Sequence, residues 1–426
     1  MTRKNNNRMN IMLILTMLFC VLILSMFAFA EDVEIVTLNA GTSEVEQKWG
    51  FQYVEEWNKN NPQMKVRYEL VPWPDLHTKV MAYIAAGTPP DMAWYFMDQI
   101  NEWHKMGVLE PLDEWLGDSK NEYLDALVNP GSDAYFDGKV YGAPFSLVAS
   151  GLAVRRDLLE EKGLSPESIK TWDDFKNAVK VLTDPPNRYG TMIILGEPRM
   201  TSLDLGWWAV SNGLGSISDF NPEKKKNYIE LLQFVVDLSP YMAPAQIGWI
   251  HRDSMTSFAQ GLVGMYATAS YFYGEIHPIS ADVMSEEKTV FIPLPYGPSM
   301  KSHSTPMYTV GYVMFKDAPH KKEAAEFLKY WVSDDVSKAF PMNLSPKKNV
   351  TIDDRTSALG EDVRWFENQW NKIIRETNGV GLKPVVPAEE IYRIFNEEII
   401  KLFKGETTPE EAYDYLKANI EPLLLD

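Results

Sequence analysis

Cysteine is almost absent from this chain of 426 residues. The only one, Cys20, lies inside an apolar run near the N-terminus. The residues before it, Leu18 and Phe19, are bulky, whereas a lipoprotein signal has small residues there. Once this run is removed on export, the remaining chain has no thiol. Disulfides and cysteine-ligated metals are therefore excluded for the exported chain.

The first thirty residues differ in composition from the rest. Arg3, Lys4 and Arg8 precede an uncharged apolar run over 11–29, and the segment ends in the tripeptide 28–30, Ala-Phe-Ala. This pattern predicts a signal peptide over 1–30 with cleavage near Ala30, and a location in the periplasm or at the extracellular face of the cytoplasmic membrane. An uncleaved anchor is the alternative, because the run approaches the ~20 residues that span a bilayer.

Positive charge is also scarce. The chain has 41 basic and 59 acidic residues, and loss of the predicted signal peptide removes three basic ones, leaving 38 against 59 and a net charge of −21. Phosphate binding needs a basic surface, so nucleic acid is excluded as a partner. We interpret the acidic excess as a solubility feature.

Motifs for cofactor binding and catalysis are missing as well. The sequence contains no Walker A loop, no G-x-G-x-x-G after a strand, no H-E-x-x-H and no G-x-S-x-G. The six histidines are scattered singly, and none stands four residues from another as in a helical zinc pair. Acidic pairs such as Asp173-Asp174 and Glu410-Glu411 suit the first turn of a helix better than a glycosidase site. We therefore predict no catalytic residue, no metal and no cofactor.

What is present is an alternation of strand-like and helix-like segments. Residues 34–38, 64–71 and 91–96 form apolar or β-branched runs, and apolar residues recur at helical spacing between them. A hairpin pattern surrounds Asp137-Gly138, and capping patterns begin at Thr171 and Thr408. This order predicts an α/β protein with mostly parallel sheets flanked by helices, and 426 residues suffice for two lobes.

Aromatic residues are abundant, with thirteen tryptophans and 12% aromatics overall. Several of them stand where predicted strands end, among them Trp73, Trp94 and Tyr95. Ligands of open α/β sheets bind beyond the carboxyl ends of the strands. A sugar offers apolar faces and a rim of hydroxyls, so flat aromatic rings with polar neighbours predict a carbohydrate site.

Seven short motifs, in order along the chain, carry a family resemblance. They are 85–91 (AAGTPPD), 107–112 (GVLEPL), 137–144 (DGKVYGAP), 171–175 (TWDDF), 258–265 around Gly261, 324–328 (AAEFL) and 408–412 (TPEEA). In this order the chain resembles the extracellular solute-binding proteins of ABC importers, in the large family that contains the maltodextrin-binding protein. The likeness covers nearly all of the exported chain.

The resemblance implies the type II periplasmic-binding-protein fold, in which two α/β lobes are joined by crossover hinge segments. We place the crossings near Leu147, Gly297 and Phe340. The predicted first lobe comprises 31–147 plus 297–340, and the second comprises 148–296 plus 341–426. Ligand would bind in the cleft, and the lobes would close over it.

The resemblance also implies site residues. Tyr95 and Tyr271 match stacking tryptophans of the family, Asp98 matches an aspartate that bonds sugar hydroxyls, and Tyr392 matches an aromatic of the last lobe. Tyrosine in place of tryptophan, and a poor match over 197–205, argue against maltodextrin itself. The complete set of predicted ligand-binding residues is Thr42, Glu44, Trp73, Trp94, Tyr95, Asp98, Trp207, Trp208, Tyr271, Tyr308, Tyr392 and Arg393.

The sequence thus predicts a monomeric, non-catalytic receptor that captures a sugar or oligosaccharide and delivers it to the permease subunits of an ABC transporter. Two alternatives stay open at this point. One keeps the fold but binds a peptide, a polyamine or glycerol phosphate. The other is an exported glycoside hydrolase.

Overall fold

The computed structural model describes residues 32–41, 44–97, 99–127, 134–341, 344–360, 363–382, 385 and 387–424. The predicted signal peptide and two predicted site residues, Thr42 and Asp98, lie outside these ranges. No helix of the described part is long and apolar enough to cross a membrane.

The first lobe begins with the predicted alternation of strands and helices. Strand β1 (Val33–Ala40) pairs in parallel with β2 (Met64–Val71) and β3 (Met92–Phe96). The elements that cover and extend this lobe are α2 (Glu44–Asn60), α3 (Trp73–Ala85), α4 (Ile100–Lys105), α5 (Asp113–Leu116), α6 (Lys120–Ala126), α13 (Lys321–Trp331) and α14 (Asp334–Lys338). The predicted hairpin is β4 (Tyr135–Phe136) with β5 (Lys139–Val140). Its turn needs positive φ at both central residues, 51° at Asp137 and 80° at Gly138, which glycine and aspartate tolerate.

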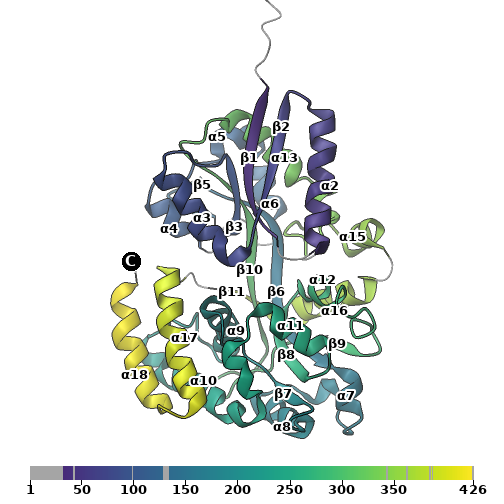
Figure 1. Ribbon diagram of the computed structural model, residues 1–426, viewed down its shortest axis with the longest axis vertical. Helices are drawn as coiled ribbons and strands as arrows, with labels where there is room; N and C mark the ends of the chain where they lie inside the picture. The colour runs from purple at the N-terminus through teal and green to yellow at the C-terminus, as the bar shows by residue number, and fades with distance from the viewer. Residues whose placement is uncertain are drawn as a thin grey trace, which may run out of the picture.

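Two long strands run through both lobes. In Figure 1 the first lobe stands above the second, and β6 (Ala143–Arg155) and β10 (Ser304–Met314) connect them. The first half of β6 pairs with β10, and its second half pairs with β8 (Val263–Ala269) and β9 (Thr289–Ile292). Both strands are almost wholly buried, because each belongs to the cores of two lobes in turn.

The sheet order is β2-β1-β3-β10-β6-β8-β7. The α/β class and the two-lobed fold are confirmed, but the sheet is mixed rather than mostly parallel. Strands β6 and β10 run antiparallel to each other, and they also run antiparallel to β8 and β3 respectively. The reason is that each crossover strand enters a lobe from the opposite end to that lobe's own strands. The lobe boundaries near 147, 297 and 340 stay predictions.

The second lobe is mainly helical around its strands. Its remaining elements are α7 (Arg156–Glu160), α8 (Trp172–Leu182), β7 (Tyr189–Thr191), α9 (Pro198–Ser211), α10 (Lys225–Leu238), α11 (His251–Ala259), α12 (Phe272–Ile276), α16 (Arg364–Glu376), β11 (Asn378–Gly381), α17 (Ala388–Lys404) and α18 (Pro409–Ile420). The predicted capping boxes are confirmed at the starts of α8 and α18, where Thr171 and Thr408 accept bonds from backbone amides three residues on.

A buried ion pair fixes the chain that follows α14. Arg355 of α15 (Ile352–Leu359) bonds both carboxylate oxygens of Glu367, and the two side chains are only 3% and 4% exposed. Arg355 Nη2 also donates to the carbonyl of Phe340 at 3.0 Å. Phe340 in turn packs edge-on against Trp49 of α2, with ring centres 4.8 Å apart. The chain after α14 is thereby tied to the aromatic core around α2.

Candidate functional site: a pocket between the lobes

A pocket of about 100 Å³ is lined by both lobes and by the crossover strands; we call it the interlobe pocket. The first lobe contributes Glu46, Trp73, Trp94 and Phe96, and the crossover strands contribute Val148, Tyr308 and Val310. The second lobe contributes Arg199, Met200, Leu203, His251, Tyr271 and Glu275. A solute held here touches both lobes at once.

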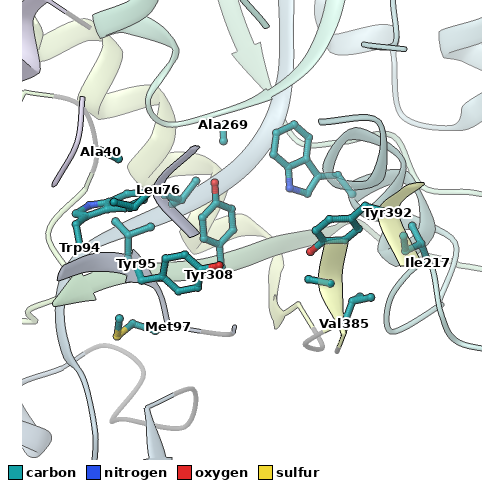
Figure 2. Close-up of a cluster of buried hydrophobic side chains, with 14 of the residues drawn as sticks. Ala40, Leu76, Trp94, Tyr95, Met97, Ile217, Ala269, Tyr308, Val385 and Tyr392 are labelled. Atoms are coloured by element: carbon teal, nitrogen blue, oxygen red, sulfur yellow. The ribbon is translucent and has the colours of Figure 1, made fainter. Parts of the chain in front are cut away.

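Aromatic rings form one wall of the pocket. Strand β3 ends in Trp94-Tyr95-Phe96, and β10 brings Tyr308 beside it. Phe96 lies edge-on to Trp94, with ring centres 4.9 Å apart, and its ring is 5.9 Å from that of Tyr308. Figure 2 shows Trp94, Tyr95 and Tyr308 together, with Tyr392 beside Ile217 and Val385. Rings at the end of a buried strand offer flat apolar faces while their own edges pack in the core.

Arg199 joins the two lobes beside this wall. It stands near the start of α9, and its guanidinium carbon is 3.8 Å from the centre of the Phe96 ring and 5.5 Å from that of Trp73. Its Nη1 donates to Gln99 Oε1 at 2.7 Å, and Gln99 Nε2 donates to the Tyr392 hydroxyl at 3.1 Å. These hydrogen bonds link Arg199 of the second lobe to Gln99 of the first lobe, and Gln99 to Tyr392 of the second lobe.

Two carboxyl groups face the pocket from opposite lobes. Glu46 is on α2 and Glu275 on α12. Burial and then the charge of Glu275 raise the pKa of Glu46 to about 8, and burial raises the pKa of Glu275 to about 7. No described lysine or arginine contributes to either shift. Burial lowers the pKa of His251 to about 4, so its imidazole is neutral at pH 7. The raised pKa values keep a proton on part of the Glu46 and Glu275 population at pH 7, so these carboxyl groups can donate as well as accept hydrogen bonds. Neutral His251 can also do both.

A second, smaller cavity adjoins the first and shares Arg199 and Leu203 with it; we call it the side cavity. Its volume is about 40 Å³. Polar groups of Gln99, Ser202, Ser216 and Tyr392 line it together with Ile217 and Val385.

The structure brings four of the predicted site residues together in the interlobe pocket: Trp73, Trp94, Tyr271 and Tyr308. Tyr392 lines the side cavity. Tyr95 lines neither of them. It is 5% exposed, its ring stacks on Trp103 with centres 4.1 Å apart, and its hydroxyl bonds Nδ1 of His77 at 2.8 Å. It supports the wall from behind.

Trp207 and Trp208 lie apart from both cavities. They are 0% and 2% exposed and line neither cavity. Trp208 packs among Trp172, Phe175 and Phe234 in the core of the second lobe. Adjacent residues on a helix point about 100° apart, but α9 is buried nearly all round, so both rings find apolar neighbours.

Arg393 and Glu44 also lie away from the pocket. Arg393 is about half exposed on α17 and pairs with Glu390 and Glu397 of its own helix. Glu44 is exposed in the first turn of α2, where a carboxylate complements the helix dipole. The carboxylate that α2 supplies to the pocket is that of Glu46, two residues on.

Sequence reasoning missed Glu46, Arg199, His251 and Glu275. A signal existed for Glu275, which stands four residues after Tyr271 and hence on the same side of a helix. Arg199 falls in the segment 197–205 that matched the family poorly. No cluster of three metal-binding side chains occurs among the residues that the structure describes.

Two lobes joined by crossover strands, with an aromatic and polar pocket between them, define a solute receptor of the type II periplasmic class. The comparisons with known proteins agree with this class. The chain belongs to the bacterial extracellular solute-binding protein family, whose model matches residues 42–338. The family resemblance predicted from the sequence is thereby confirmed.

Among curated relatives, a putative binding protein of Brucella abortus is 24% identical over 333 residues, covering 75% of this chain and 78% of that protein. The arabinooligosaccharide-binding protein of Halalkalibacterium halodurans is 23% identical, covering 82% and 73%. Among solved structures, a solute-binding protein of Thermotoga lettingae bound with α-D-tagatose superposes with a TM-score of 0.76 at 22% identity, covering 92% of this chain and all of that one. A substrate-binding protein of Listeria monocytogenes in complex with cycloalternan gives 0.74 at 22% identity, covering 91% and 98%. These likenesses establish the fold.

Proposed function

We propose that this chain is the sugar-binding receptor of an ABC importer, which captures a sugar or oligosaccharide between its lobes and delivers it to the membrane permease. The observation that carries the proposal is the composition of the interlobe pocket. Trp73, Trp94 and Tyr308 offer apolar faces, and Tyr271, Glu46 and Glu275 offer hydroxyl and carboxyl groups. This pairing suits the apolar faces and hydroxyl rim of a sugar ring.

Lobe closure follows from the same arrangement. A ligand that contacts residues of both lobes stabilises the closed form by its additional contacts there. The crossover strands β6 and β10 supply the connection about which the lobes move. Micromolar affinity, or roughly −8 kcal/mol, is the expected order for such a receptor.

The named relatives support a sugar as the solute. Their names and titles record arabino-oligosaccharide, tagatose and cycloalternan as ligands of those proteins. We further propose that the chain acts as a monomer, outside the cytoplasmic membrane, and that it binds its solute without converting it. Asp98 and Thr42 stay in the proposed site on the family resemblance alone.

The test is a titration of the protein from residue 31 onward with mono- and oligosaccharides, followed by tryptophan fluorescence and calorimetry. Saturable binding and recovery of the sugar unchanged would support the proposal. Absence of binding to every sugar, or conversion of the sugar to products, would contradict it. Arg393→Ala serves as the control variant, because Arg393 lies on the exposed side of α17.

One observation favours a second candidate, a cationic solute such as a polyamine. Glu46 and Glu275 face the pocket from opposite lobes, and neither has an ion-pair partner in the described part of the chain. Spermidine in the same titration distinguishes the two candidates. Its binding should weaken strongly in Glu46→Gln if the carboxylates hold an ammonium group.

A further inference from the structure

The side cavity is lined by a buried serine hydroxyl that has no hydrogen-bond partner among the described residues. Ser202 is 4% exposed, and its Oγ has no hydrogen-bond partner among the described residues. Two neighbouring polar residues of α9 do have partners: Thr201 donates to the Ile194 carbonyl, and Asp204 accepts from the Ile194 amide and the Tyr266 hydroxyl. A buried hydroxyl left unbonded disfavours the folded state, and the Ser202 hydroxyl, unlike a hydroxyl enclosed in the core, borders a cavity in which an incoming group could bond it.

A glycine keeps the same cavity open. Gly206 lies one helical turn after Ser202 in the middle of α9 and lines the side cavity. A Cβ added there would meet no atom within 4 Å. Glycine inside a helix is unfavourable relative to alanine, and here no close approach of another chain segment requires it. Close packing therefore does not account for glycine at this position, and its lack of a side chain leaves part of the cavity empty.

The side cavity is sized and lined for a small polar group. Its volume of about 40 Å³ exceeds the roughly 10–15 Å³ that one water needs, and it is much smaller than a pocket for a whole ligand. Its wall offers the Ser202 hydroxyl, the Ser216 hydroxyl, which also bonds Ser218 at 2.9 Å, and the Tyr392 hydroxyl. Arg199 and Leu203 line both this cavity and the interlobe pocket, so the two spaces are neighbours.

We propose that the side cavity is a specificity subsite that takes the exocyclic hydroxymethyl arm of a sugar whose ring lies in the interlobe pocket. The ligand class is thereby narrowed to hexose-type rings that carry such an arm, as opposed to pentose rings that lack it. The inference rests on the proposed function as a sugar receptor. Ser202 donates to or accepts from the arm's hydroxyl, and Gly206 leaves room for its methylene.

The experiment compares D-xylose with D-glucose and L-arabinose with D-galactose, pairs that differ only by one hydroxymethyl group, and xylobiose with cellobiose, which differ by one such group on each ring. Affinities are measured by calorimetry on the protein from residue 31 onward. For any pair that binds, the member with the arm should bind about threefold to tenfold more tightly, the effect of one added hydrogen bond.

Two variants test the assignment. Ser202→Ala removes the hydroxyl, and Gly206→Val fills the cavity from a position where a Cβ meets no neighbour. Both should abolish the preference within a pair while leaving the pentose member's affinity unchanged. Ser146→Ala is the matched control: its hydroxyl is likewise buried and without a partner among the described residues, but Ser146 lines neither cavity. The preference should survive in Ser146→Ala.

The outcomes separate this inference from the one on which it rests. Equal affinity within every pair, or a preference that persists in Gly206→Val, would overturn the subsite and leave the sugar receptor standing. Tighter binding of D-glucuronate than of D-glucose would also overturn it, since the cavity would then be an anion site. No binding of any sugar would overturn both proposals.

Discussion

The guanidinium carbon of Arg199 lies 3.8 Å from the centre of the Phe96 ring. Helix α9 of the second lobe therefore contacts the last residue of β3 in the first lobe. This contact and the Arg199–Gln99 hydrogen bond connect the lobes, and Arg199 and Gln99 are 100 positions apart in sequence. The pocket's geometry therefore depends on how far the lobes are closed.

Arg199→Ala should open the protein in the absence of ligand. The substitution removes a cation–π contact and a charge-assisted hydrogen bond between the lobes, together worth about 1–3 kcal/mol. Small-angle X-ray scattering should show a larger radius of gyration for the variant. Arg393→Ala, which removes only pairs within one exposed helix, should leave the scattering curve unchanged.

Stability should fall as pH rises from about 4.5 to about 8, in the part contributed by Glu46 and Glu275. In this window the unfolded chain has released its protons, while the folded chain retains them because burial raises both pKa values. The double variant Glu46→Gln, Glu275→Gln should reduce the change in unfolding free energy across this window by on the order of 2 kcal/mol. The effect is kept this small because both side chains are half-buried and solvent screens them in part. Urea denaturation at several pH values measures it.

Some slope should remain in the double variant. Burial also raises the pKa of Asp204 to about 8, and this residue lies in the second lobe's core with its own hydrogen bonds. A profile identical to that of the unaltered protein would show that Glu46 and Glu275 do not titrate together in the pocket.

Trp73 and Trp208 should respond differently to alanine. Trp73 is partly exposed in the interlobe pocket, so Trp73→Ala should weaken sugar binding by about 1 kcal/mol or more and alter stability little. Trp208 is enclosed by aromatic rings, so Trp208→Ala should cost about 3–5 kcal/mol of unfolding free energy. Calorimetric titration and thermal unfolding of both variants separate binding from packing. A stable Trp208→Ala with lost affinity would return Trp208 to the site.

Arg355→Ala should be strongly destabilising. It leaves Glu367 charged, buried and unpaired, and it removes the donor to the Phe340 carbonyl, for a loss of about 3–5 kcal/mol. The denaturation midpoint in guanidinium chloride reports the effect. The variant Arg355→Met, Glu367→Leu should recover most of the loss, because no unpaired charge stays buried; failure to recover would mean that the carbonyl bonds matter more than the ion pair.

Much of the fold could be predicted because local patterns carry it. The alternation of strands and helices, the Asp137-Gly138 turn and the caps at Thr171 and Thr408 depend on residues close together in sequence, and each is confirmed. The mixed sheet could not be read in this way. Strand direction depends on where the crossover strands β6 and β10 enter each lobe, and no local pattern records it.

The candidate site divides along the same line. Position at or after the end of a strand indicated Trp73 and Trp94, and the family resemblance implied Tyr271; all three line the pocket. The abundance of aromatics also suggested Trp207 and Trp208, which do not line it. An aromatic residue packed in a core and an aromatic residue that lines a binding pocket have the same sequence signature. Only their neighbours in space differ.

The sequence by itself determined the α/β class and the family, because both depend on the order of short motifs and on local hydrophobic periodicity. The tertiary structure alone decided that Glu46 faces Glu275, that Arg199 reaches Phe96 and Gln99, and that Ser202 borders an open space beside Gly206. These relationships join residues of different elements, and their distances are fixed by the packing of two lobes about shared strands.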